Sequence, residues 1–189
     1  MDVVGICNAA LGLVGSGSIT ALDDATTEAG LCTRLYTPAR DAVLAERVWT
    51  FATERISVAA DATAPAFGYA YRYAIPSTTL RVLEVGDGTS SSDVDWRREG
   101  AFVLTDQAGP VYMRVLKRIE DPALWSPGFV QALTYRLAAD LCTPLNENRT
   151  LRADLWNLYQ SSLKTAAYTD GMQGRGEPLR AGRLSSVRG

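Results

Sequence analysis

The sequence predicts an α+β fold, mainly α-helical, with helices at both ends of the chain and strands between them. Apolar residues recur at intervals of three and four in residues 2–48 and again in residues 126–170, which is typical of helices with one buried face. In residues 49–119 they alternate with polar residues, which is typical of strands. This order favours a bundle of about four helices with an inserted small antiparallel β-sheet. We expect one domain over residues 1–170 and an extended C-terminal arm over residues 171–189.

The first helix is expected over residues 2–15. Apolar side chains cover it nearly all round, so we expect it to be deeply buried. A Gly–Ser–Gly–Ser segment at residues 15–18 should end it.

The second helix is expected over residues 24–48. Asp23 or Asp24 can cap its first turn, and Glu28 lies near its positive N-terminal end. Pro38 falls in the helix interior, where it lacks the N–H group that the helix needs. We therefore expect a kink or a break at this residue.

The inserted sheet is expected within residues 49–119. Polar loops punctuate it at residues 86–92 and at residues 106–110, and the second of these predicts a hairpin turn. The alternating residues that predict the strands are Phe67, Tyr69, Tyr71, Tyr73 and Ile75, then Leu80 and Val82, then Val111, Met113, Val115 and Ile119.

Two long helices are expected over residues 126–143 and 147–170. A Ser–Pro pair opens the first, Pro144 should stop it, and Asn146 or Asn148 can cap the second. Because the two helices cannot cover both of their apolar faces alone, the N-terminal third of the chain must pack on them. The residues expected on the two buried faces are Phe129, Val130, Leu133, Leu137 and Leu141, then Leu151, Leu155, Leu158, Tyr159, Leu163 and Ala166.

The composition is that of an ordinary soluble protein with one domain. The 189 residues are 47% hydrophobic and 21% charged, and the formal net charge of −2 offers no overall attraction to nucleic acid or anionic membranes. No apolar run approaches the ~20 residues of a membrane span. The Met1–Asp2 start lacks a basic region and is a poor signal peptide.

The chain contains no histidine, which removes the Ser–His and Cys–His nucleophile systems and the commonest metal ligand. Cys7, Cys32 and Cys142 each lie among apolar residues, so we expect buried free thiols; a disulfide or a metal role is the alternative. We expect no catalytic, cofactor or metal site.

Two short polar motifs have a structural and a functional interpretation. Residues 12–17 resemble a nucleotide-binding loop only superficially, because they follow a helix and their glycines are in the wrong order, so a helix-terminating loop is favoured. Asp23 and Asp24 could serve acid–base or metal chemistry, but a helix cap accounts for them more simply.

The aromatic residues are mostly assigned to the core. Tyr69–Tyr73 could stack nucleic-acid bases, but too few basic residues lie among them, and sheet packing is favoured. Trp96, between charged neighbours, is a candidate contact. The tryptophans expected in the core are Trp49, Trp125 and Trp156.

Residues 171–189 form a tail without a core, which is expected to be mobile in solution. Glycines interrupt it, and four arginines outweigh a single glutamate. It could be a solvated end without a function, or an arm that orders on a partner through arginine contacts.

Several segments, in their order and spacing, resemble a bacteriophage head-to-tail adaptor of the tail tubular protein A type, found in T7-like short-tailed phages. The resemblance covers roughly residues 5–170. The segments that carry it are Asn8–Gly15, Ile19–Asp24, Ala29–Tyr36, Arg40–Leu44, Trp49–Ala52, Tyr71–Pro76 with Leu80–Val82, Phe129–Leu133 and Tyr135–Ala138.

The resemblance implies a structural virion protein of the phage neck, made in the bacterial host cytoplasm, and no enzyme. Members form a ring, usually a dodecamer, that binds the portal protein above and the tail nozzle or hub below, while DNA passes through its channel without specific binding. Their C-terminal segment reaches the portal. The resemblance therefore implies a portal-binding arm here, with Arg175, Leu179, Arg180, Arg183, Leu184 and Arg188. We take Asp87, Ser91 and Trp96 as candidate tail-side contacts.

The alternative is a small DNA-binding or packaging-accessory protein. In that interpretation the arginines of residues 175–188 contact phosphates, and the affinity for DNA falls steeply with salt. An enzyme is disfavoured, because the chain lacks histidine and shows no polar constellation suited to catalysis.

Overall fold

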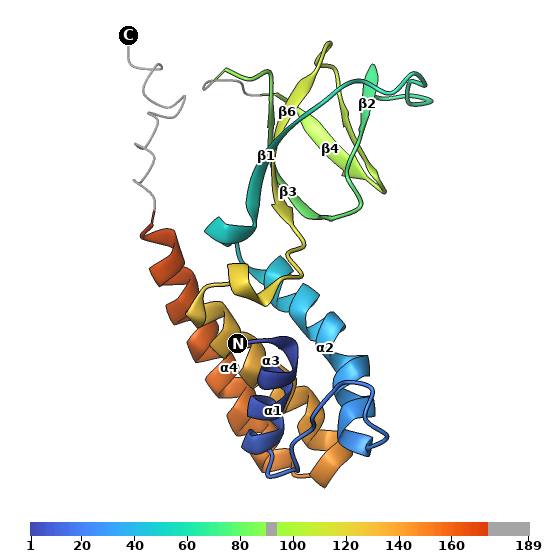
Figure 1. Cartoon of the computed structure of the whole chain (residues 1–189). Helices are drawn as coiled ribbons and strands as arrows, with labels where there is room; N and C mark the ends of the chain where they lie inside the picture. The colour runs from blue at the N-terminus through green and yellow to red at the C-terminus, as the bar shows by residue number, and fades with distance from the viewer. Residues whose placement is uncertain (90–93, 174–189) are drawn as a thin grey trace.

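The computed structural model describes residues 1–89 and 94–173. These residues form a helical body at one end of the molecule and a β module at the other (Figure 1). The module is inserted between the second and third helices, so the predicted α+β, mainly α, fold is confirmed. The described residues contain four α-helices, α1 (Val3–Leu13), α2 (Thr27–Glu46), α3 (Pro127–Asn146) and α4 (Arg149–Gly171).

Helix α3 is the centre of the body, because α1, α2 and α4 all pack against it. Its buried face is the predicted one, with Phe129, Leu133 and Leu137 fully buried. The prediction that Pro144 stops this helix is wrong, since α3 continues to Asn146. A proline in the last turn removes one hydrogen bond only, and the helix ends where Glu147 adopts a left-handed conformation with a φ of 54°.

Helix α4 lies on the outside of the body. The Asn148 side chain caps it by accepting a hydrogen bond of 3.0 Å from the backbone N–H of Leu151, as one of the two predicted alternatives requires. Leu155, Tyr159 and Leu163 lie on the predicted buried face. Leu158, also assigned to that face, is 47% exposed, because it lies to one side of the narrow face that meets α3.

Helix α1 is buried on one face rather than all round. Ile6 and Cys7 are fully buried, but Leu13 at its end is 39% exposed. All three cysteines, Cys7, Cys32 and Cys142, are buried free thiols, as predicted.

The predicted start of α2 is wrong. Thr26 caps the helix by accepting a hydrogen bond from the backbone N–H of Ala29. The Asp24 carboxylate instead accepts hydrogen bonds from the backbone N–H groups of Ala21 and Thr20, and these bonds hold the pKa of Asp24 below its usual value. Because these hydrogen bonds hold Asp24 in the connecting segment before α2, the helix begins only after this residue.

Helix α2 runs through Pro38 without a break. The predicted break is therefore wrong. Tertiary packing on α3 compensates for the missing hydrogen bond, since residues on both sides of the proline, including Tyr36 and Ala39, are buried.

In the described residues, the β module contains two three-stranded antiparallel sheets, where the sequence predicted one sheet. The strand orders are β1-β6-β3 and β2-β5-β4. The two sheets contribute to one shared core, which includes Tyr73, Val103 and Met113. The strands are β1 (Thr53–Val58), β2 (Tyr71–Ala74), β3 (Thr79–Gly86), β4 (Trp96–Glu99), β5 (Phe102–Thr105) and β6 (Val111–Lys117).

The hairpin turn predicted at residues 106–110 is wrong. This segment leaves β5 in one sheet and enters β6 in the other, so it crosses between the sheets. The Tyr73 hydroxyl lies 2.5 Å from the carbonyl oxygen of Gln107 and 2.9 Å from that of Gly109 and holds the crossing in place. The local sequence of such a crossing is the same as that of a hairpin turn.

The helical body and the β module meet around the ends of β1 and β6. Leu116, on β6, is fully buried in the core of the helical body, whereas its neighbour Val115 belongs to the core of the two sheets. Trp49 is fully buried where α2 leads into the module, and its indole N–H donates a 3.1 Å hydrogen bond to the carbonyl oxygen of Val43.

Candidate functional site

The predicted contact residues fall partly outside the described structure. All six residues of the predicted portal-binding arm, Arg175, Leu179, Arg180, Arg183, Leu184 and Arg188, lie outside the described residues, and so does Ser91. Asp87 follows β3, and its carboxylate accepts hydrogen bonds from the backbone N–H and the hydroxyl of Thr89. Trp96 begins β4 in the other sheet and is partly buried against the core of the module. Their role as tail-side contacts stays a prediction.

The described residues contain no group of three or more Cys, Asp or Glu side chains suited to holding a metal ion. Over the same residues, every helix is too short or too polar to cross a membrane.

The end of α4 is fixed to the root of the β module by Asp170, whose side chain is almost fully buried. Its carboxylate accepts a hydrogen bond of 2.6 Å from the backbone N–H of Thr50 and one of 2.8 Å from the Thr50 hydroxyl. Thr50 is the first residue of a short 3₁₀-helix whose preceding residue, Trp49, provides no side-chain cap. Asp170 therefore caps this helix from a distance of 120 residues in the sequence.

Sequence reasoning missed Asp170, although a signal was present. A carboxylate in the last turn of a helix lies near the negative end of the helix dipole, which is unfavourable unless donors elsewhere compensate. The Thr50 N–H and hydroxyl are those donors.

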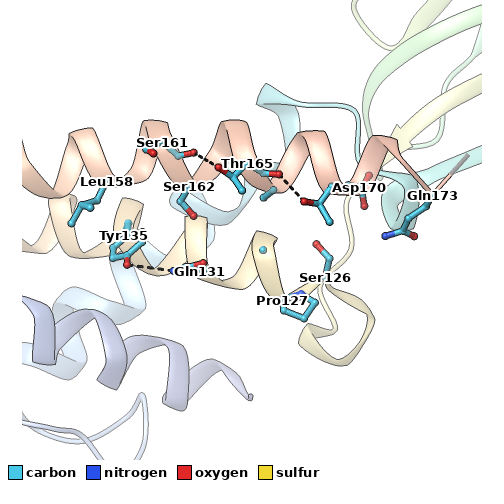
Figure 2. Close-up of a pocket in the computed structure, with 13 residues that line it drawn as sticks. Ser126, Pro127, Gln131, Tyr135, Leu158, Ser161, Ser162, Thr165, Asp170 and Gln173 are labelled. Carbon is cyan, nitrogen blue, oxygen red and sulfur yellow. Dashed lines mark hydrogen bonds between the residues drawn. The ribbon is translucent and has the colours of Figure 1, made fainter. Parts of the chain in front are cut away.

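A groove of 480 Å³ runs between α3 and α4 (Figure 2). The N-terminal half of α3 forms one wall and the C-terminal half of α4 forms the other. Figure 2 shows Tyr135 and Leu158 at one end, and Ser126 and Asp170 at the other.

The groove is narrow at its floor because the two helices approach closely. A methyl group added at Gly128 of α3 would lie 2.8 Å from the Cβ atom and 3.2 Å from the Cα atom of Ala166 on α4. Only glycine fits at this crossing without moving one helix. The groove could not be predicted from the sequence, because the residues that line it come from two segments far apart in the chain.

The walls of the groove are less polar than their composition suggests. The hydroxyl of Thr165 donates to the carbonyl oxygen of Ser161, and that of Thr169 donates to the carbonyl oxygen of Thr165 (Figure 2). These hydroxyls are satisfied within α4. Among the described residues that line the groove, Asp170 is the only Asp, Glu, Lys or Arg, and its carboxylate is engaged by Thr50.

A polar cluster lies on the other side of α4, where this helix faces Arg136 of α3. The Arg136 guanidinium forms a 2.9 Å salt bridge with Asp140 and lies 4.9 Å from the centre of the Trp156 ring. Trp156 is 38% exposed, so its assignment to the core is wrong. An exposed tryptophan in a helix is indistinguishable from a buried one in sequence, because the arginine that covers it comes from another helix.

Tyr159 joins α4 to α2, since its hydroxyl donates a hydrogen bond to the carboxylate of Glu46. Burial raises the pKa of Tyr159 above its usual value, and the neighbouring Glu46 carboxylate raises it further. The tyrosine therefore remains a neutral hydrogen-bond donor over the physiological pH range.

A second, smaller pocket of 370 Å³ lies on the outer face of the β2-β5-β4 sheet. The Arg72 guanidinium stacks 4.6 Å from the centre of the Phe102 ring and forms a 2.9 Å salt bridge with Asp61. Phe67, predicted in a strand, lies in the loop before β2 and is 88% exposed beside this pocket. Tyr73 is buried as predicted, so Tyr69–Tyr73 cannot form a continuous stacking face.

No model of a known protein family matches the chain. No curated protein matches it significantly either.

Proposed function

We propose that this protein is a head-to-tail adaptor subunit of a bacteriophage, which forms a ring between the portal protein and the tail nozzle or hub. The observation that carries the proposal is the open flank of α4, which packs on α3 with one narrow face and leaves Leu158 half-exposed and Tyr168 and Met172 largely exposed. Together with the order of motifs described above, this flank supports a subunit that functions beside copies of itself.

The shape of the molecule also supports the proposal. A ring subunit stacked between two other assemblies needs two ends for different partners and two flanks for its neighbours. The helical body and the β module are the two ends here, and α4 runs along one flank (Figure 1). A charge of −2 suits a channel wall that lets DNA pass without holding it.

The portal-binding arm is assigned to residues 171–189, of which 174–189 lie outside the described structure. Asp170 fixes the end of α4 to Thr50 at the root of the β module, so the chain leaves the described structure from a defined point. An arm on every subunit would make a weak contact avid when it is repeated around a ring.

The test is the solution mass, measured by light scattering, of the full chain alone and mixed with a purified portal ring. We expect the 20.4 kDa chain to join a portal-sized complex. A chain cut after Gln173 should remain folded but join poorly, because the cut retains α4 and the bonds between Asp170 and Thr50.

Each outcome decides between interpretations. Undiminished portal binding by the shortened chain contradicts the arm assignment. A full chain that ignores the portal but binds DNA with a steep salt dependence supports the packaging-accessory alternative, in which the arginines after residue 174 contact phosphates.

A further inference from the structure

We propose that the groove between α3 and α4 is the docking site for this chain's own residues 174–189, which turn back at the end of α4 and lie along it. The inference concerns the free chain and does not depend on the proposed function. Because residues 174–189 also make up most of the proposed portal-binding arm, the groove and the portal would compete for them.

The described part of the chain ends at the groove. Gln173 is its last residue and lines the groove at the end that holds Asp170 (Figure 2). The Gln173 backbone N–H donates a 3.1 Å hydrogen bond to the carbonyl oxygen of Asp170, which keeps Gln173 at the end of α4. Residue 174 therefore starts where the groove starts. A segment tethered beside a site is present there at a roughly millimolar effective concentration, which favours it over a free partner.

The segment is long enough to turn and to fill the groove. Gly174 and Gly176 follow α4, and glycine adopts the left-handed conformations that tight turns often need. From Gln173 back to Leu158, the groove follows the chain over fifteen residues, or about 22 Å at 1.5 Å per helical residue. An extended chain covers this distance in about seven residues. The 16 residues from 174 to 189 therefore suffice for the turn and for the whole groove.

The groove suits apolar side chains rather than charged ones. Among the described residues that line it, Asp170 is the only Asp, Glu, Lys or Arg, and Thr50 engages its carboxylate. The hydroxyls of Thr165 and Thr169 donate to carbonyl groups within α4. The groove therefore offers no free charge to a ligand, and it gains most by covering apolar surface.

The segment supplies apolar side chains at a suitable spacing. Tyr135 and the half-exposed Leu158 form the far end of the groove (Figure 2). Seven extended residues counted from Glu177, which follows the second glycine, end at Leu184 and cover about 23 Å. Leu184 therefore reaches Leu158 and Tyr135. The apolar residues of the segment are Pro178, Leu179, Ala181, Leu184 and Val187.

The segment and the helical body also carry opposite charges. Residues 174–189 contain four arginines and one glutamate. Residues 1–52 and 120–173, which include the four helices of the described structure, contain twelve Asp or Glu and seven Lys or Arg. This long-range attraction favours the segment on the body over the segment in solvent. A neutral or acidic partner would lack it.

The experiment measures how fast a thiol in the groove reacts. The native cysteines Cys7, Cys32 and Cys142 are fully buried, so a maleimide should label an introduced surface cysteine selectively. Thr165→Cys places the thiol in the groove, and Ala153→Cys places it on the exposed surface of α4 outside the groove. Both are labelled in the full chain and in a chain that ends at residue 173, with no portal present.

We expect labelling at position 165 to be about tenfold slower in the full chain than in the shortened chain, as when the segment occupies the groove in roughly nine molecules of ten. Labelling at position 153 should be the same in both chains. Equal rates at position 165 overturn the inference. A slowing that grows with protein concentration also overturns it, because a second copy then covers the groove.

Two full-length variants separate the apolar contact from the charge. Leu184→Asp should restore fast labelling at position 165, because a carboxylate without a partner is unfavourable in the apolar end of the groove. Ser185→Asp adds the same charge one residue later and should leave the labelling slow. Equal effects of the two variants, whether both restore the fast rate or neither does, overturn the inference. Since no portal is present, these rates are independent of the light-scattering test of the proposed function.

Discussion

Asp170 combines two properties that seldom occur together in one side chain, burial and a negative charge without a cation beside it. It is 2% exposed, and the salt bridges of the described residues do not include it. Two hydrogen bonds from Thr50 offset the cost of its burial. The two hydrogen bonds between Asp170 and Thr50 therefore hold the last turn of α4 against the start of the β module.

We expect Asp170→Ala to lower the free energy of unfolding by about 1–2 kcal/mol, because it leaves the Thr50 N–H without its acceptor. Thr50→Val should cost about 0.5–1 kcal/mol, since it removes only the hydroxyl bond. Urea denaturation of both single variants and the double variant measures the coupling. If the two losses simply add, the residues do not act together.

Gly128 is a second residue whose role depends on a partner far away in sequence. We expect Gly128→Ala to destabilise the protein by roughly 1–3 kcal/mol, because the new methyl group would lie 2.8 Å from the Cβ atom of Ala166. Gly30→Ala in α2 is the matched control, since a methyl group there meets no atom within 4 Å. It should stabilise the helix by about 0.4–1 kcal/mol.

Thermal unfolding followed by circular dichroism measures both changes. If Gly128→Ala destabilises the protein no more than Gly30→Ala does, the contact between α3 and α4 at Gly128 has room for a methyl group. A partial recovery on adding Ala166→Gly would locate the strain at this crossing.

Among the elements, the helices were the most predictable part of the chain. The spacing of Phe129, Leu133 and Leu137 predicted the buried face of α3, and Asn148 was among the predicted caps of α4. Helix ends were less predictable. Pro38 is tolerated because packing of α2 on α3 compensates for one lost hydrogen bond. Pro144 is tolerated because it lies in the last turn of α3.

The β module was predicted only in outline. Alternation located β3 and β6, but it could not reveal that β5 pairs with β2 and β4 in a separate sheet. The alternation of apolar and polar residues in a strand is the same whether the segment after it crosses to another sheet or returns in a hairpin. The division into two sheets depends on contacts such as that between Tyr73 and the segment 106–110, which are distant in sequence.

The candidate site was the least predictable part. Sequence reasoning selected Asp87 and Trp96, together with Ser91 and six residues after 174 that lie outside the described structure. It did not find the groove between α3 and α4. The groove exists because Gly128 meets Ala166 across two helices, and a sequence contains no direct record of such a crossing.

At the scale of the whole molecule, the described residues form two cores that share one strand. Leu116 lies in the helical core, and Val115, the residue before it, lies in the core of the two sheets. If either core unfolds, β6 loses its packing there, and the other core then loses the strand that it shares. The helical body and the β module are therefore expected to lose their structure together, although they look like separate units in outline (Figure 1).

This shared strand makes cooperativity a property of the whole chain. Calorimetry should give one transition, with a calorimetric enthalpy equal to the van't Hoff enthalpy. Leu116→Ala should lower the free energy of unfolding by about 2–5 kcal/mol and keep a single transition at a lower temperature. Two separate transitions in the wild type would mean that the two cores melt independently. A subunit that melts as one unit can transmit a load from one of its ends to the other without an internal weak point.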